Sequence, residues 1–277
     1  MSFLKKIGTF YINAHIHVSL AASCMVFITG IVFRTAVLEV SIFVGFSTLL
    51  SYNIIRFLKY KSFVLNQNSS DWFERNKWKV WVLMCVSFFG ALYMLLFLET
   101  IALLVLLPFV LIVMLYMAPV FPDGISKRTL RNLPFVKIFS ISLTWSGVTV
   151  IFPLMNSGVT MDRVVWFFFL YQFLFVFIWT LPFDIRDIAH DAQGMKTIPQ
   201  ILGVKRTKRL GMILLILMSF LPFHFLENSV FVLVPTGILF LMVALWSSKV
   251  KQAPFYASFW VESIPIWQFI LFVCTDL

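Results

Sequence analysis

Long apolar segments, separated by short polar stretches, run through the whole chain. Nine can be marked, at residues 14–33, 37–57, 79–98, 100–119, 134–154, 164–183, 210–226, 229–247 and 258–275. About 20 residues of helix cross the ~30 Å hydrocarbon core of a bilayer. The segments lack the alternation of barrel strands, and lipid leaves no backbone polar group unpaired, so helices are expected. The pattern predicts an all-α polytopic membrane protein with nine transmembrane helices, in a single domain over residues 1–277.

The basic residues are distributed unevenly between the two sides that this pattern defines. If the nine segments alternate in direction, the N-terminus shares one side with the connections after the second, fourth, sixth and eighth segments. Of the 22 Lys and Arg residues, all but Arg34 and Arg163 fall on that side. Because Lys and Arg stay cytoplasmic during insertion, we expect a cytoplasmic N-terminus and an external C-terminus.

Composition agrees with a membrane protein and accounts for the net charge. The chain is 61% hydrophobic and 12% charged, whereas about a quarter of an average soluble chain is charged. A net charge of +10 follows from topology and from attraction to anionic headgroups, so we expect membrane lipids and no nucleic acid as partners. No transit-peptide pattern precedes the first apolar segment, which favours a bacterial inner membrane.

Three aspartates follow the sixth apolar segment, at the expected cytoplasmic face. Asp184, Asp187 and Asp191 are spaced i, i+3 and i+7, which places them on one face of a helix. Like charges so close repel one another unless a cation lies among them, and carboxylates favour Mg²⁺. The spacing predicts a Mg²⁺ site and the catalytic residues, although a solvated helix end in a basic loop would show the same three acids.

Basic residues near these aspartates point to a phosphorylated ligand. Mg²⁺ typically accepts one or two protein carboxylates and completes its octahedron with substrate phosphates. Arg186 and Lys196 lie beside the motif, and Lys127 and Arg128 lie in the preceding cytoplasmic connection. Such side chains can neutralise the charge of a diphosphate leaving group.

The acidic motif resembles that of a known family. Asp184-x-x-Asp187-x-x-x-Asp191, followed by Gly194-x-Lys196-Thr197-Ile198-Pro199, is similar to the second aspartate-rich motif of the UbiA superfamily of intramembrane prenyltransferases. Residues 127–132 resemble the basic connection before the fifth span in that family. The resemblance implies a nine-helix bundle in which Mg²⁺ holds an isoprenoid diphosphate between two aspartate motifs and the prenyl group passes to an acceptor.

The first aspartate-rich motif of that family has lost its acids in this chain. The family pattern Asn-Asp-x-x-Asp-x-x-x-Asp aligns with residues 53–61, where the aspartate positions hold Ile54, Phe57 and Lys61. A metal site divided between two motifs therefore lacks half of its expected ligands.

Two interpretations of this loss remain open. In the first, Asn53, Arg56 and Lys59 bind the diphosphate directly while the second motif holds one Mg²⁺, and prenyl transfer persists. In the second, the chain is a catalytically degenerate, lipid-binding or partner-binding subunit of a membrane complex. Its second motif would then form ion pairs with Arg56, Lys59 or Lys61.

One further acid lies within an apolar segment. Glu262 stands early in the ninth segment, where a carboxylate is costly unless it is paired or protonated. We expect Lys249 or Lys251 as its partner and consider it a candidate proton acceptor.

Overall fold

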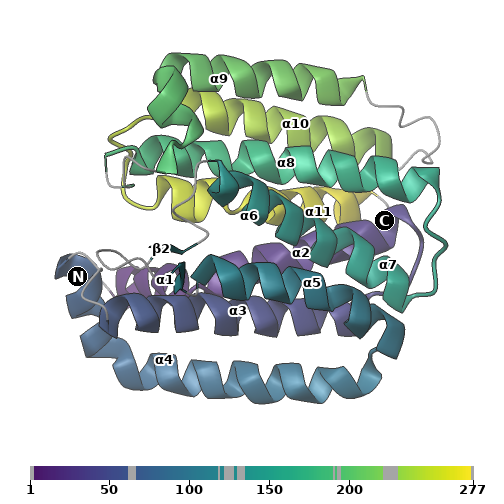
Figure 1. Cartoon of the computed structure of the whole chain (residues 1–277), viewed down its shortest axis with the longest axis horizontal. Coiled ribbons are helices and arrows are strands. Elements are labelled where there is room, and N and C mark those ends of the chain that lie inside the picture. Colours follow the sequence, from purple (N-terminus) through teal and green to yellow (C-terminus); the bar gives the residue numbers. More distant parts are fainter. Residues whose placement is uncertain are drawn as a thin grey trace.

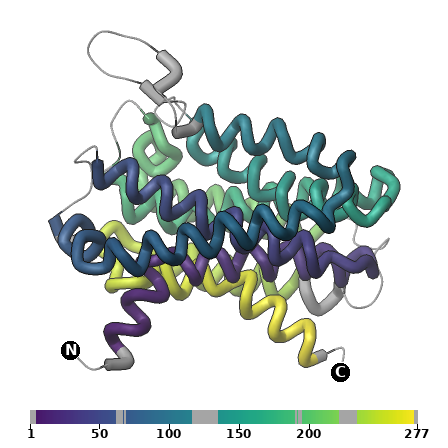
Figure 2. Tube along the Cα trace, turned by 90° about the horizontal axis from the view of Figure 1, so that it is seen from below, coloured from purple at the N-terminus to yellow at the C-terminus, as the bar shows by residue number. Residues whose placement is uncertain are grey.

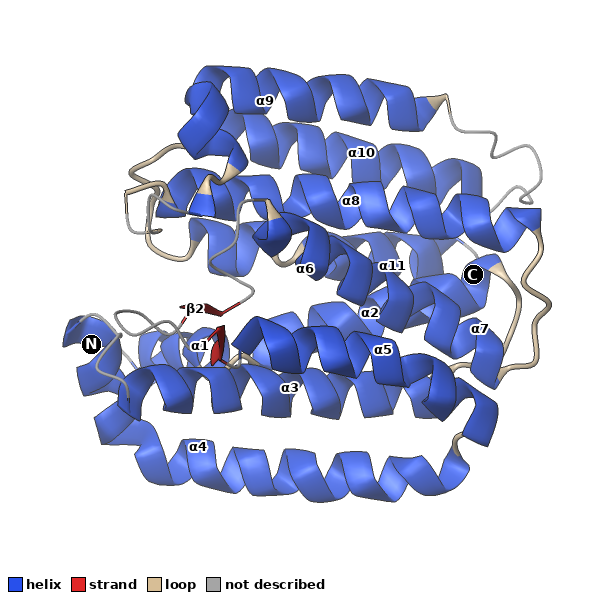
Figure 3. Cartoon of the chain, viewed as in Figure 1, coloured by secondary structure: helices blue, strands red, loops and turns tan. Residues whose placement is uncertain are grey.

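The chain folds almost entirely into helices (Figure 3). The computed structural model describes residues 3–61, 67–117, 119–121, 128–129, 135–189, 191, 195–220 and 230–275. Its elements are α1 (Phe3–Asn13), α2 (Ile16–Val32), α3 (Leu38–Lys61), α4 (Gln67–Met94), η1 (Leu95–Phe97), α5 (Thr100–Met117), β1 (Pro119–Phe121), β2 (Arg128–Thr129), α6 (Val136–Ser146), η3 (Gly147–Ile151), α7 (Phe152–Asn156), α8 (Arg163–Asp187), α9 (Ile198–Ser219), α10 (Val230–Ser247), η6 (Tyr256–Val261) and α11 (Ile264–Thr275). The short antiparallel pair of β1 and β2 was not predicted.

Successive long segments run in alternating directions (Figure 1). The described residues of every predicted apolar segment lie mainly in helices, and residues 118, 134, 221–226 and 229 of these segments lie outside the described part of the chain. The C-terminal ends of α3, α5 and α8 and the beginnings of α4, α6 and α9 gather at one end of the bundle, on the left in Figure 1. In Figure 2, α1 and the end of α11 lie at opposite ends of the molecule, as an odd number of segments requires.

Several of these helices are long and apolar enough to cross a membrane, which makes the chain a polytopic integral membrane protein. In the described residues five segments qualify: Leu38–Lys61, Ser69–Phe97, Val136–Asn156, Arg163–Asp187 and Tyr256–Cys274. The pair Lys5–Asn13 and Ile16–Val32, bent by 61°, would make a sixth, and Thr100–Leu115 and Val234–Ser247 are shorter apolar helices. The predicted count of nine crossings and their orientation stay predictions.

Helix α8 lies in the core of the bundle, whereas α4 lies at its surface. On α8, Tyr171, Phe175 and Ile178 are almost fully buried against α2, α6 and α10 residues of one apolar cluster. On α4, Trp78 and Phe89 are largely exposed. A helix that is apolar all round suits a core position, and exposed aromatic residues suit a surface in contact with lipid.

Two segments are wound as π-helices, and neighbouring helices donate hydrogen bonds to both. In η3 the carbonyl of Thr149 accepts a 2.7 Å bond from Thr29 Oγ1 of α2. In η6 the carbonyl of Val261 accepts a 2.6 Å bond from Trp179 Nε1 of α8. Irregular backbone inside a membrane protein is tolerated where side chains satisfy its polar groups, so these two contacts stabilise the widened turns.

The close approach of α5 to η3 depends on a residue without a side chain. A Cβ atom on Gly147 would lie 2.1 Å from Cε1 and Cζ of Phe109. We expect Gly147→Val to lower the free energy of unfolding by about 1–3 kcal/mol through overpacking, seen as a lower Tm in detergent. Gly8→Val is the control, because no atom lies within 4 Å of a Cβ there. Equal Tm values for the two variants would contradict this packing.

Candidate functional site

The acidic motif lies at the C-terminal end of α8. Helix α8 continues through Pro182 to Asp187. The amide of Asp191 then donates a 2.8 Å hydrogen bond to the carbonyl of Asp187. Asp184 and Asp191 therefore stand about two turns apart on the same side, as their spacing predicts.

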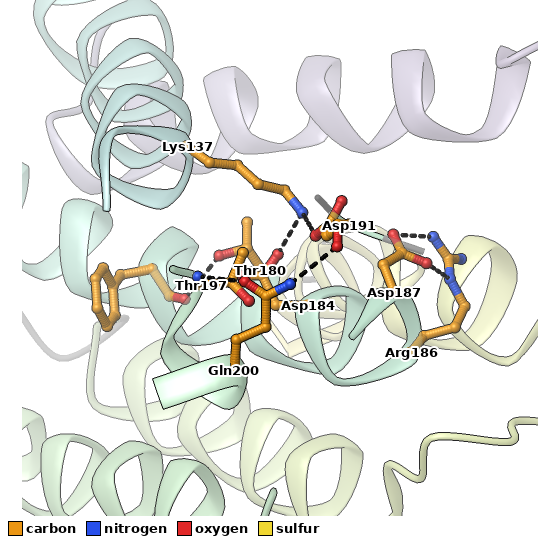
Figure 4. A network of polar contacts seen from close by, with 9 residues as sticks. Lys137, Thr180, Asp184, Arg186, Asp187, Asp191, Thr197 and Gln200 are labelled. Carbon is orange, nitrogen blue, oxygen red and sulfur yellow. Dashed lines mark hydrogen bonds and ion pairs between the residues drawn. The ribbon is translucent and has the colours of Figure 1, made fainter. Parts of the chain in front are cut away.

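A lysine from α6 joins these two aspartates. Lys137 Nζ lies 2.8 Å from Asp184 Oδ1 and 2.6 Å from Asp191 Oδ2 (Figure 4). Lys137 is 8% exposed and Asp184 is 3% exposed, so the interaction is shielded from water. Buried charges are stable only when they are paired and hydrogen-bonded, and this triad meets that condition.

Asp187 forms a separate ion pair. Its two carboxylate oxygens accept bonds of 2.7 Å and 3.0 Å from Nε and a terminal nitrogen of Arg186, the residue before it. The Arg186 guanidinium also lies 5.4 Å from the ring centre of Phe183. The three aspartates, expected on one face, are therefore divided into a pair around Lys137 and a single carboxylate on Arg186.

Glu262 stands between η6 and α11, and η6 packs against α8 in the bundle. Its expected pairing with Lys249 or Lys251 stays a prediction.

The segment after the motif is fixed to the start of α9. Gln200 Nε2 donates a 3.0 Å bond to the carbonyl of Asp191, and Gln200 Oε1 accepts a 3.0 Å bond from the amide of Thr197. Lys196, next to Thr197, is exposed and has a positive φ of 44°. A left-handed conformation is costly for a residue with a Cβ, so the backbone here is strained and held by its neighbours.

The segment that replaces the first motif holds the break between α1 and α2. Asn53 is buried, and its Nδ2 donates to the carbonyls of Ala14, at 2.9 Å, and Leu49, at 2.8 Å. Its Oδ1 has no hydrogen-bond partner among the described residues. Asn53 thus has a clear structural role at the break between α1 and α2.

Arg56 is the most completely described base of this segment. Its Nε donates a 3.1 Å bond to Nε2 of His15, and its guanidinium lies 5.1 Å from the ring centre of Trp72 on α4. Lys59 lies three residues after Arg56, about one turn further along α3. The end of α3 therefore presents a basic cluster where the family pattern would place acids.

The remaining expected residues lie at the edge of the described chain. Arg128 belongs to β2, but its side chain is not described, and Lys127 lies outside the described residues. Lys61 places its Nζ 4.9 Å from the ring centre of Phe57. The ion pairs that the structure shows on the second motif come from Lys137 and Arg186, neither of which belongs to the first-motif segment.

The donor set around the three aspartates does not fit a Mg²⁺ ion as it stands. Among the described residues, no group of three or more His, Cys, Asp or Glu side chains is placed to hold a metal ion. A metal ligand must offer a lone pair toward the ion, but Oδ1 of Asp184 and Oδ2 of Asp191 are both engaged by the Lys137 ammonium group.

The sequence did not lead us to expect Lys137 and Gln200 as contacts of the second motif. A signal for Lys137 existed, since it lies inside the apolar segment 134–154 and a charged residue within a span is expected to have a partner. Gln200 had no such signal, because a polar residue in the first turn of a helix is ordinary.

Comparisons with known proteins identify relatives of this chain. The sequence profile of the UbiA prenyltransferase family matches residues 74–264, which confirms the resemblance seen in the second motif. No curated protein matches. A UbiA homolog from Archaeoglobus fulgidus bound to DMAPP and Mg²⁺ has a similar structure, with a TM-score of 0.64 at 13% identity over 95% of this chain and 98% of that one.

Other structures of the Archaeoglobus fulgidus homolog give the same result. The form bound to GPP and Mg²⁺ matches with a TM-score of 0.64 at 14% identity, over 95% of this chain and 98% of the other. The form bound to Cd²⁺ matches with a TM-score of 0.60 at 15% identity, over 95% and 97%. At such low identity these matches show a shared fold.

The hydrogen bonds of Asn53 predict an effect on stability in the absence of any ligand. Asn53→Leu would leave the buried Ala14 carbonyl unpaired, so we expect a loss of about 1–3 kcal/mol and a lower Tm in detergent. Asn76→Leu is the control, because Asn76 Nδ2 bonds only to Trp72 within its own helix. A Tm for Asn53→Leu equal to that of the wild type would show that this residue does not hold the α1–α2 break.

Proposed function

Because the chain belongs to the UbiA prenyltransferase family, we propose that it transfers a prenyl group from an isoprenoid diphosphate to an acceptor at the cytoplasmic face of a membrane. The nine predicted spans, with the N-terminus inside, belong to this proposal, as does location in a bacterial inner membrane. Most of the Lys and Arg residues would then face the cytoplasm together with the site.

The buried triad of Lys137, Asp184 and Asp191 is the observation that carries the proposal. Burying three charged groups costs free energy, and charged residues at membrane depth commonly mark functional sites. The triad lies at the same end of the bundle as the C-terminal turns of α3, which bear Arg56 and Lys59 (Figure 1). Structures of a related protein are described as bound to DMAPP or GPP with Mg²⁺, which supports an isoprenoid diphosphate as the ligand.

The basic residues at this end suit the diphosphate. A guanidinium has five N–H donors and matches phosphate oxygens, and Arg56 uses only its Nε on His15 in the hydrogen bond described above. We assign diphosphate binding to Asn53, Arg56, Lys59, Lys127, Arg128, Arg186 and Lys196.

The transfer itself requires separation of charge. The bond between C1 of the prenyl group and the diphosphate oxygen breaks, and its electron pair leaves with the diphosphate. A nucleophilic atom of the acceptor forms the new bond to C1 with its own electron pair, and its proton passes to solvent or to the released diphosphate. The basic residues would stabilise the leaving group, and aromatic side chains such as Trp145 and Trp179, whose ring centres are 5.2 Å apart, would keep water from the allylic cation.

A Mg²⁺ ion bound with the diphosphate would supply additional positive charge to the leaving group. The three aspartates form ion pairs with Lys137 and Arg186. The bases of the chain therefore carry the electrostatic part of this proposal.

A second candidate function is favoured by the lost first motif. Ile54, Phe57 and Lys61 occupy the positions of its acids. A degenerate family member would keep the bundle and bind a lipid or a partner subunit without turnover. Ligand binding and product formation, measured separately, distinguish the two functions.

Binding of GPP should stabilise the purified protein. At 100 times the Kd a ligand stabilises the native state by about 2.7 kcal/mol, so we expect a higher Tm for the wild type. We expect this shift to fall strongly in Arg56→Gln, because a guanidinium at the diphosphate is lost. Lys77→Gln removes an exposed base paired with Glu74 and should keep the full shift. Equal shifts in all three proteins would exclude Arg56 from the binding site.

Turnover should depend on Asp184. Asp184→Asn removes one of the two carboxylates that hold the Lys137 ammonium group and so disturbs the charge arrangement of the site. We expect it to reduce prenyl transfer to membrane acceptors by about 10²–10³-fold, the size of effect seen when one preorganised electrostatic group is lost, measured with radiolabelled prenyl diphosphate in membranes. Glu99→Gln, an exposed acid at the opposite end of the bundle, should keep wild-type activity. Binding of prenyl diphosphates without any product in the wild type, across several chain lengths, would instead establish the second candidate function.

A further inference from the structure

Lys137 lies at a position that would disfavour a cation if its neighbours were neutral. It is the second residue of α6, which begins at Val136 after Phe135 in a left-handed conformation (φ 62°). The N-terminus of a helix carries a partial positive charge, and the Lys137 side chain is buried. Both effects oppose a buried ammonium group here, so its contacts with carboxylates must compensate for them.

Those contacts are provided by two aspartates at once. The Nζ atom lies within 2.8 Å of one oxygen of Asp184 and 2.6 Å of one oxygen of Asp191. An ammonium group has three N–H donors and no lone pair, so it bridges the carboxylates as a small cation would. In Figure 4 its nitrogen lies between the two acids, whereas Asp187 points toward Arg186.

We propose that Lys137 is a built-in counter-ion that takes the place of a divalent cation between Asp184 and Asp191, so that the wild-type protein binds no divalent metal ion at this pair. A metal ion bridging the same two oxygens would lie close to the ammonium nitrogen and would be repelled by it. Mg²⁺ also needs six ligands near 2.0–2.1 Å, and the third aspartate of the motif is held by Arg186.

This inference concerns the electrostatics of the proposed prenyl-transfer site, yet it can be tested without a prenyl diphosphate. Metal binding is measured directly, so its result does not depend on whether the chain transfers a prenyl group. If Lys137 is the counter-ion, the chain neutralises Asp184 and Asp191 with a residue of its own. Its ligand binding should then not require Mg²⁺ at these two aspartates.

The test uses Mn²⁺, which has a strong electron paramagnetic resonance signal when free in solution. The full-length protein in detergent is titrated with Mn²⁺ alone. We expect the wild type to leave the free signal unchanged, whereas Lys137→Gln should bind about one Mn²⁺ at least tenfold more tightly. Addition of Asp184→Asn to that variant should abolish binding. Lys77→Gln, which removes an exposed lysine from a surface pair, should behave as the wild type.

Two results would overturn the proposal. One is Mn²⁺ binding by the wild type that is lost in Asp184→Asn, which would mean that Lys137 moves aside for the metal ion. The other is a folded Lys137→Gln protein that gains no Mn²⁺. If Lys137→Gln folds only when Mn²⁺ is present, the metal ion replaces the lysine and the proposal stands. If that variant does not fold at all, Mn²⁺ binding by the wild type is compared with binding by Asp184→Asn: equal binding supports the proposal, and binding by the wild type alone contradicts it.

Discussion

The hydrocarbon environment requires that every polar group within the bundle find a partner inside the protein. Helices satisfy the backbone, and side chains of neighbouring helices satisfy the irregular turns, as Thr29 does for η3 and Trp179 does for η6. Charged groups meet the same requirement only in opposite pairs. The position of the acid–base cluster, at the end of α8 where the helices meet a polar connection, follows from this constraint.

The same requirement explains how a site can change its chemistry while the bundle stays intact. Because Ile54 and Phe57 stand where the family pattern has aspartates, a metal ion held between the two motifs would have fewer ligands. A base beside the second motif can neutralise its carboxylates in place of that metal ion. Lys137 bonds to two aspartates, and Arg186 bonds to the third. Each carboxylate of the second motif is thus paired within the protein, which is the arrangement expected for acids that must remain charged next to lipid.

The family fold places little demand on sequence identity. At 13–15% identity the helices still superimpose on those of an Archaeoglobus fulgidus homolog over about 95% of the chain. Apolar residues of similar size can replace one another in a bundle, provided that close contacts such as Gly147 against Phe109 are kept. Chemistry depends instead on a few polar positions at one end, and there the chain departs from the pattern.

The sequence by itself determined the helical class, the positions of the long segments and the family, because apolar length, the distribution of Lys and Arg, and the spacing of Asp184, Asp187 and Asp191 are local properties. Pairing of Asp184 with Asp191 could also be predicted, since seven residues make two helical turns. Only the tertiary structure showed that Lys137, 47 residues before Asp184 in the chain, fills the space between them. Which base reaches which acid depends on the packing of α6 against α8, and no local pattern contains that distance.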